Sequence, residues 1–182
     1  MKPYALKEQV ILLDAHGNDV GTAEKLAAHR AGLRHLALSV FIFDDVGRLL
    51  VQQRAAGKYH SALKWANSVC SHPRPGEDIL SAAERRVGEE LGAEADLRFW
   101  RTYAYRADVG SGLTEDELCH LFVGRLRSPL APKPDEVADI AWLDRSALKD
   151  WRDGSERDAL APWFALYLKD LTDPLFDIGA RA

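Results

Sequence analysis

Hydrophobic and polar positions along the 182-residue chain fall into short blocks that follow two different periods. Residues 9–14, 35–45 and 64–70 run apolar or alternate with polar residues, which is typical of strands. Two longer segments, roughly 97–107 and 117–126, are also expected to be strands, with a polar loop between them. Strands mixed with separate helical segments predict an α+β fold with a mixed sheet.

The clearest helical pattern covers residues 77–92. Ile79, Val87 and Leu91 share one face of this segment, and Gly92 is placed to end it. The other helices are expected at residues 22–29 (capped by Thr22), 144–151 and 159–171.

A turn sequence at residues 45–48 predicts a hairpin between 35–45 and the following apolar run at 49–55. A further short strand is expected at 140–144. No internal repeat or low-complexity block appears, and 182 residues with 47% hydrophobic content suit one compact domain.

Charge and cysteine content narrow the class of protein. The net charge of -4 gives no overall basic field to attract nucleic acid, and no apolar stretch approaches the ~20 residues that span a bilayer. The two cysteines, Cys70 and Cys119, are too few for a secreted disulfide framework. We therefore expect a cytoplasmic protein, a monomer or weak dimer, that binds neither nucleic acid nor membrane.

Charged residues crowd the later part of the expected helix at 77–92. Arg85 and Glu89 are four residues apart and can pair on a solvated face, which requires no special function. The spacing of Glu77, Arg85, Glu89 and Glu90 also resembles the NUDIX box. In that loop–helix–loop, helix glutamates hold divalent cations against a diphosphate.

Three positions differ from the NUDIX pattern. Ser71 stands where the pattern has its opening glycine, and Ala93 stands where it has an aliphatic residue. Arg86 replaces a glutamate, which removes a metal ligand and supplies a fixed positive charge instead. Such a site is suited to binding a diphosphate but poorly equipped to activate water against it.

Seven further segments resemble, in order, the type 1 isopentenyl diphosphate isomerases of the NUDIX superfamily. They are EKLAAHR, RHLALS, NSVCSHP, YRAD, EDELCHLF, EV and APWF, within residues 9–165. The resemblance implies one NUDIX-like catalytic domain over residues 1–182, with N- and C-terminal extensions, folded as an α/β/α sandwich with a mixed sheet. It also implies an enzyme of isoprenoid biosynthesis that interconverts two small-molecule diphosphates, isopentenyl and dimethylallyl diphosphate. Residues 56–68 lack a Trp-Pro-Gly feature of some relatives, which affects the expected loop shape.

The resemblance further implies two metal sites. One divalent ion would be held by three histidines and two glutamates: His29, His35, His72, Glu115 and Glu117. This mixed nitrogen and oxygen set suits Mn²⁺ or Mg²⁺ in octahedral geometry, or Zn²⁺ in an expanded shell. A second ion, Mg²⁺, would bind the diphosphate and Glu90. The other histidines, His16, His60 and His120, match no motif and are expected to be surface or core residues.

The reaction implied by the resemblance adds a proton to one face of an alkene and removes another from the opposite face. Cys70 and Glu117 are assigned to the two faces, and Tyr105 assists beside Glu117. We expect Glu117 to be the acid and Cys70 the base, which requires a thiol pKa below its ordinary value of ~8.5. Cys119, in an apolar strand, is expected to be a core residue.

Substrate contacts follow from the same resemblance. Four basic residues would bind the diphosphate: Lys25, Arg54, Lys58 and Arg86. Trp163 would cover the hydrocarbon, where its ring face can stabilise a carbocation. Two alternatives remain open at this point. The first is a NUDIX hydrolase that cleaves a diphosphate, and the second is a metal-binding or interaction module without activity.

Overall fold

The computed structural model describes residues 8–181, and its largest sheet is mixed. The strand order is β2-β1-β3-β8-β7, with β6 paired to β3. These strands are β1 (Gln9–Leu13), β2 (Asp19–Glu24), β3 (Arg34–Ile42), β6 (Val69–Ser71), β7 (Ala95–Gly110) and β8 (Leu113–Leu126). Strands β3 and β8 run parallel, and the other pairs run antiparallel. A smaller antiparallel sheet contains β5 (Trp65–Asn67), β4 (Leu49–Arg54) and β9 (Val137–Leu143).

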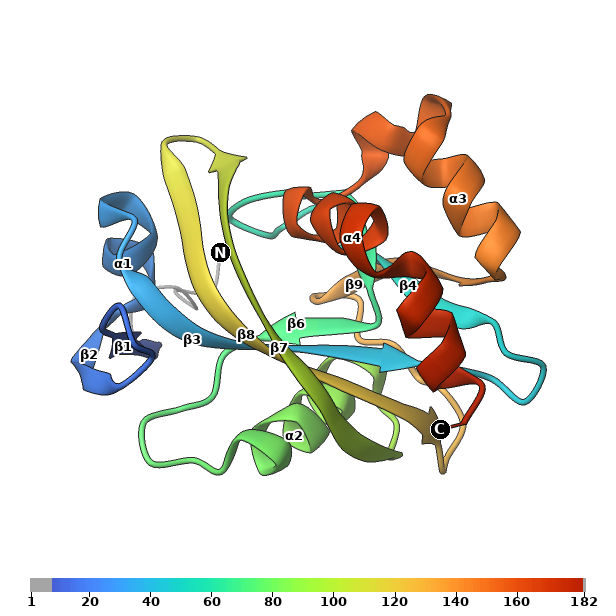
Figure 1. The fold of residues 1–182 in the computed structure, drawn as a ribbon, viewed down its shortest axis with the longest axis horizontal. Helices are drawn as coiled ribbons and strands as arrows, with labels where there is room; N and C mark the ends of the chain where they lie inside the picture. Colours follow the sequence, from blue (N-terminus) through green and yellow to red (C-terminus); the bar gives the residue numbers. More distant parts are fainter. Residues whose placement is uncertain (1–7, 182) are drawn as a thin grey trace.

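Helices cover both faces of the large sheet. The four α-helices are α1 (Lys25–Ala31), α2 (Ile79–Leu91), α3 (Arg145–Asp153) and α4 (Pro162–Gly179), with a 3₁₀ turn at Ser155–Ala159. Helix α2 lies on one side of β3, β7 and β8, and α4 lies on the other side, with α3 beyond it (Figure 1). This arrangement confirms the predicted α+β class with a mixed sheet between helices.

Strand β3 is buried on both faces, which explains its nearly continuous apolar sequence. Leu38 and Val40 pack in the cluster that contains the apolar face of α2. Ala37 and Phe41, on the opposite face, pack with α4 residues such as Phe164. The functional residues that β3 and β8 contribute share the α4 face of the sheet, because side chains two residues apart on a strand point the same way.

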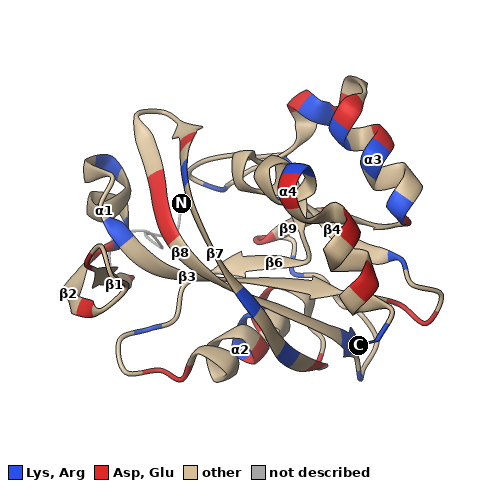
Figure 2. Ribbon diagram, viewed as in Figure 1, with Lys and Arg blue, Asp and Glu red and all other residues tan. Residues whose placement is uncertain are grey.

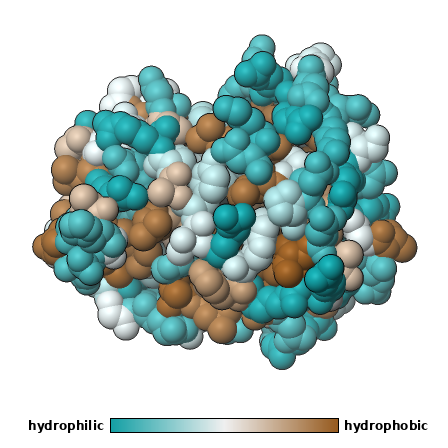
Figure 3. Space-filling model, in the orientation of Figure 1, coloured by the Kyte–Doolittle hydropathy of each residue, from teal (hydrophilic) through white to brown (hydrophobic). Residues whose placement is uncertain are grey.

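The surface mixes polar and apolar residues. Charges of both signs alternate along α3, and an acidic band lies in the first part of β8, near the hairpin with β7 (Figure 2). Hydrophobic patches are broken up by hydrophilic residues on the face seen in Figure 3. Within the described residues 8–181, no helix has the length and hydropathy to span a membrane.

The helix expected at 22–29 begins later. Thr22 lies in β2, and the N-terminal cap is Glu24, whose carboxylate accepts hydrogen bonds from the Leu26 and Ala27 N–H groups. Strand pairing to β1 holds Thr22 extended, with Ile11 opposite it. The prediction of Thr22 as a cap was therefore wrong, because tertiary pairing overrides the local signal.

The prediction of a hairpin between 35–45 and 49–55 was also wrong, because the two strands do not pair along their length. A single bridge joins Phe43 to Leu49, after which β4 enters the smaller sheet between β5 and β9. The strand expected at 64–70 divides between the two sheets, as β5 and β6. This division places Cys70 beside β3 rather than in the smaller sheet.

Two element boundaries move for local reasons. Helix α2 starts after Asp78, which accepts a hydrogen bond from the Ser81 N–H, so Glu77 precedes the helix instead of opening it. Strands β7 and β8 extend through the expected loop, because Ser111 and Gly112 both adopt positive φ and close a two-residue turn.

Candidate active site

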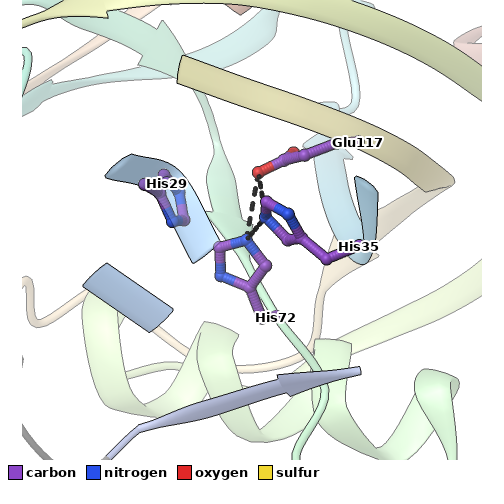
Figure 4. A group of neighbouring side chains, drawn as sticks. All are labelled: His29, His35, His72 and Glu117. Atoms are coloured by element: carbon purple, nitrogen blue, oxygen red, sulfur yellow. Dashed lines mark hydrogen bonds and ion pairs between the residues drawn. The ribbon is translucent and has the colours of Figure 1, made fainter. Parts of the chain in front are cut away.

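Three imidazoles and one carboxylate meet at one end of the parallel pair β3 and β8 (Figure 4). His29 comes from α1, His35 from β3, His72 from the segment after β6 and Glu117 from β8. The register explains the meeting, because His35 is the direct neighbour of Glu117 in the ladder. One ligand atom from each of these four residues lies within 4.8 Å of all the others.

The separations inside this group are those of ligands around one ion. His35 Nε2 is 3.2 Å from His72 Nε2 and 3.3 Å from Glu117 Oε1, and His72 Nε2 is 3.0 Å from that oxygen. Neighbouring ligands of an octahedral ion with bonds of about 2.1 Å stand about 3.0 Å apart. The three atoms therefore match one face of such a coordination shell.

The imidazole tautomers also fit a metal. His29 Nδ1 lies 2.7 Å from the Lys25 carbonyl, and His35 Nδ1 lies 2.7 Å from the Leu33 carbonyl. Each Nδ1 must donate to its carbonyl, which leaves Nε2 as a lone pair aimed into the group. Among the described residues, the buried His29 Nε2 has no hydrogen-bond partner. These residues can hold a divalent metal ion.

Glu115 lies two residues before Glu117 on β8, so the two side chains are on the same face of the sheet. Tyr105 is opposite Glu117 in the β7–β8 ladder, and its hydroxyl is 2.9 Å from Glu115 Oε2 and 2.6 Å from Glu117 Oε2. One hydroxyl proton cannot serve both contacts. Burial and the charge of Glu117 raise the pKa of Glu115 well above its ordinary value.

Glu117 behaves oppositely. Burial alone would raise its pKa, but contacts with His35 and His72 in their protonated forms bring the pKa of Glu117 well below the ordinary value. Adjacent carboxyl groups with pKa values pushed apart are a common feature of sites that move protons. The environments of Glu115 and Glu117 thus shift their pKa values in opposite directions.

Cys70 faces the same pocket from β6. Its Sγ donates to Asn67 Oδ1 at 2.8 Å and accepts a hydrogen bond from Trp163 Nε1 at 3.0 Å. Ser39, the ladder neighbour of Cys70, places its Oγ 3.4 Å from the sulfur and 3.1 Å from the Tyr167 hydroxyl. Burial raises the pKa of Cys70 to about 12, so the sulfur is a thiol at neutral pH.

The four predicted basic contacts line the same pocket as Cys70 and Glu117: Lys25, Arg54, Lys58 and Arg86. Lys25 pairs with Glu8 at 2.9 Å, and Lys58 pairs with Glu136. Arg54 lies 5.1 Å over the Trp163 ring and donates to backbone carbonyls. Trp163 itself is nearly fully buried at the start of α4.

Arg86 lies where α2 meets this pocket. Its guanidinium donates to Glu89 and Glu90 at 2.6 Å each and to Glu136 at 3.2 Å. Glu90 is buried and also accepts from Gln52 at 2.7 Å. The predicted ligand for the second ion is therefore held in an ion pair beneath Arg86.

Three residues in or beside the pocket had no role assigned from the sequence. His60, expected to be a surface or core residue, is 7% exposed and has its Nε2 3.4 Å from Glu115 Oε1. Asn67 and Ser39 contact the cysteine directly. Asn67 and Ser39 stand in the matching segments NSVCSHP and RHLALS, but neither was given a role. His60 had no such signal, because it enters from a loop outside these segments.

The NUDIX domain family matches residues 33–164. An Aromatoleum aromaticum protein named isopentenyl-diphosphate Delta-isomerase 2 is 47% identical over 79% of this chain and 76% of its own length. The chain belongs to the isopentenyl-diphosphate Delta-isomerase family. Another family member, named isopentenyl-diphosphate Delta-isomerase, from Serratia proteamaculans, is 42% identical over 91% of this chain and 92% of its own length.

Solved structures agree on the fold of this isomerase family member. A Deinococcus radiodurans protein superposes with a TM-score of 0.71 at 18% identity, covering 89% of this chain and 98% of its own. A MutT NUDIX hydrolase from Burkholderia pseudomallei gives 0.58 at 18% identity, covering 76% and 98%. At these identities the likeness concerns the NUDIX fold alone, which matches the predicted fold class.

Proposed function

We propose that this chain is an isopentenyl-diphosphate Delta-isomerase, which interconverts isopentenyl and dimethylallyl diphosphate. The observation that carries the proposal is one shared pocket. It is lined by Cys70 and Glu117, with Tyr105 against the carboxylate and four basic side chains at its rim. A single catalytic domain, complete in a monomer, suffices for this arrangement.

The alkene of the substrate is a very weak base, so its isomerisation needs strong positioning. A proton is added to the terminal CH₂ carbon, which becomes a methyl group, and positive charge develops on the adjacent tertiary carbon. A second proton then leaves the carbon on the other side of that centre, and the double bond forms there. The two steps need a donor and an acceptor on opposite faces, in a pocket that excludes water.

We assign Cys70 and Glu117 to these two faces, with Tyr105 positioning the Glu117 carboxylate. The raised pKa of Cys70 and the lowered pKa of Glu117 put the resting proton on sulfur. This distribution favours Cys70 as the first donor and Glu117 as the acceptor. The opposite order, expected from the sequence, requires a proton to pass from the thiol to Glu117 before turnover.

The remaining residues bind the two ends of the substrate. Trp163 faces the hydrocarbon, and a dry ring face stabilises a nearby cation by about 2 kcal/mol. Lys25, Arg54, Lys58 and Arg86 bind the diphosphate, in part by exchanging their present carboxylate partners for phosphate oxygens. Mg²⁺ on the diphosphate, next to Glu90, completes this end. Mn²⁺, Zn²⁺ or Mg²⁺ held by the His/Glu group would supply a Lewis acid, which would favour the ionised form of Glu117 at rest.

We further propose a reducing location such as the cytoplasm. Both cysteines are free in the structure. The proposed chemistry requires Cys70 to remain a thiol, which an oxidising compartment would not favour.

The test is a proton-exchange assay in deuterated water with isopentenyl diphosphate and Mg²⁺. The proposal predicts dimethylallyl diphosphate with deuterium in a methyl group, detected by NMR. Steady release of orthophosphate, or of nucleotide from nucleoside diphosphate compounds, would instead indicate the hydrolase alternative. Metal binding with neither product would indicate a binding module.

A further inference from the structure

His60 is a buried imidazole that the proposed chemistry does not use. It lies in the loop between β4 and β5, yet its side chain turns into the pocket and is only 4% exposed. Its ring packs edge-on against Trp163, with centroids 5.8 Å apart, and edge-on against Tyr59, with centroids 4.4 Å apart. Two aromatic walls therefore fix the direction in which its Nε2 points.

The loop backbone is held so that His60 stays inside. Arg54 donates its guanidinium N–H groups to the carbonyls of His60 at 3.1 Å and Ser61 at 3.2 Å. Ser61 and Leu63 adopt positive φ values of 49° and 59°, which non-glycine residues rarely do. Such conformations cost of order 1 kcal/mol or more each and persist only where surrounding contacts impose them.

The imidazole belongs to a second group of ligand atoms that shares His29 with the first. His60, His29 and Glu115 each place one ligand atom within 4.8 Å of the other two. The rings of His29 and His60 are stacked, with centroids 5.9 Å apart. His29 Nε2, which has no hydrogen-bond partner among the described residues, therefore lies between both groups.

We propose that His60 is a ligand of the metal centre, joining it together with Glu115. This chain then offers a divalent ion four imidazoles and two carboxylates, rather than the three and two that the sequence motifs indicate. The separation of 3.4 Å between His60 Nε2 and Glu115 Oε1 exceeds the usual range of a hydrogen bond. It is near the spacing of about 3 Å between adjacent ligands of one ion.

The other ring nitrogen supports this role. His60 Nδ1 lies on the loop side, 3.3 Å from the Ser61 hydroxyl, which leaves Nε2 as the ring nitrogen on the side of Glu115. Metal-bound histidines commonly use one nitrogen for the ion and the other for such a partner. A nitrogen-rich shell favours Mn²⁺, Co²⁺ or Zn²⁺ over Mg²⁺, because imidazole suits transition ions and Mg²⁺ prefers oxygen.

The experiment counts histidine ligands directly. Metal-free protein is loaded with one equivalent of Co²⁺, and X-ray absorption at the cobalt edge measures the number of bound imidazoles. The proposal predicts four in the unaltered protein and three in His60→Ala. A count of three in the unaltered protein, or an equal count in both proteins, would overturn it.

Competition titration gives a second measure. His60→Ala should bind Co²⁺ at least tenfold more weakly than the unaltered protein. His60→Gln keeps a hydrogen-bonding side chain near Glu115 but has no imidazole, and it should show the same lost ligand. His120→Ala, which removes a histidine packed against Phe99, should retain all four imidazoles. Full-strength Co²⁺ binding by both His60 variants would contradict the proposal, and circular dichroism checks that they fold.

Discussion

Helix α2 and the His/Glu group at the end of β3 and β8 both gather carboxylates, but the two regions satisfy them differently. On α2, arginines take up the charge: Arg85 donates to Glu77 at 2.6 and 2.8 Å, and Arg86 donates to Glu89 and Glu90. In the other region the neighbours are imidazoles, and His29 Nε2 has no partner among the described residues.

The difference follows from the chemistry of the partners. An arginine keeps its proton and has no lone pair, so a cation approaching α2 must break an ion pair and face a fixed positive charge. A neutral histidine offers a lone pair and carries no charge. The glutamates of α2 therefore hold arginines in place for anion binding. The glutamates beside the histidines can instead bind a metal ion.

The largest expected effect comes from removing the groups that transfer protons in the pocket at β3 and β8. Cys70→Ala and Glu117→Gln should each lower the turnover number by about 10²–10⁴-fold or more, because each removes a donor or acceptor that the alkene needs. The conversion of isopentenyl diphosphate, followed by NMR, measures the loss.

The matched control is Glu84→Gln, which changes an exposed carboxylate on α2 outside the proposed site. It should turn over within a few-fold of the unaltered protein. Near-normal turnover of Cys70→Ala or Glu117→Gln would remove that residue from the mechanism.

The second largest effect is the stabilisation of the fold by a bound metal ion, which should depend on the His/Glu group and not on α2. Adding Mn²⁺ at about 100 times its dissociation constant to metal-free protein should stabilise the fold by about 2.7 kcal/mol, a rise in melting temperature of about 5–10 °C. Differential scanning calorimetry measures the shift. His35→Ala should abolish most of it, whereas Glu89→Gln should keep it. An equal loss in both variants would mean that the ion binds on α2.

Much of the fold could be predicted, because buried periodic segments carry strong signals. The α2 helix, with its capping Gly92 at a φ of 60°, and the buried strand β3 follow directly from their patterns. The sequence could not show that the hairpin expected after β3 does not form. The turn signal is local, and the choice of β9 as partner for β4 depends on a strand more than 80 residues away.

The site likewise contains residues that sequence motifs could identify and residues that only the tertiary structure brings in. His35 and Glu117 fall in motifs, and the parallel register of β3 and β8 brings them together. Ser39 reaches Cys70 only through the β3–β6 register, and His60 enters from a loop with unusual backbone angles. The expected low pKa of Cys70 also needed the structure, because burial raises it to about 12.

Reversing the charge of Arg86 tests whether α2 binds the diphosphate. Arg86→Glu restores the NUDIX pattern but removes a contact worth about 1.5–3 kcal/mol to the diphosphate. The Michaelis constant should rise by about 10–100-fold, measured in the isomerisation assay. Arg85→Gln, which breaks pairs with Glu77 and Glu89, is the control and should change it much less. A lower Michaelis constant for Arg86→Glu would contradict the assigned role.

The smallest effect concerns the loop that precedes α2. The hydrogen bonds from Arg85 lower the pKa of Glu77 to about 2, compared with ~4.3 in an unfolded chain. Because the folded value is the lower one, the ionised carboxylate stabilises the fold above pH ~4.3, and this contribution is lost as the pH falls toward 2. Glu77→Gln should reduce the free energy of unfolding by about 0.2–1 kcal/mol at pH 7.

The deficit of Glu77→Gln should shrink between pH 4 and pH 3, when urea denaturation compares it with the unaltered protein. Glu84→Gln changes an exposed glutamate on the same helix and should leave stability nearly unchanged at pH 7. A deficit that stays constant down to pH 3 would show that Glu77 stabilises the loop by packing rather than by charge. The arginines of α2 would then matter for binding anions and not for holding the helix, which would weaken half of the contrast between the two regions.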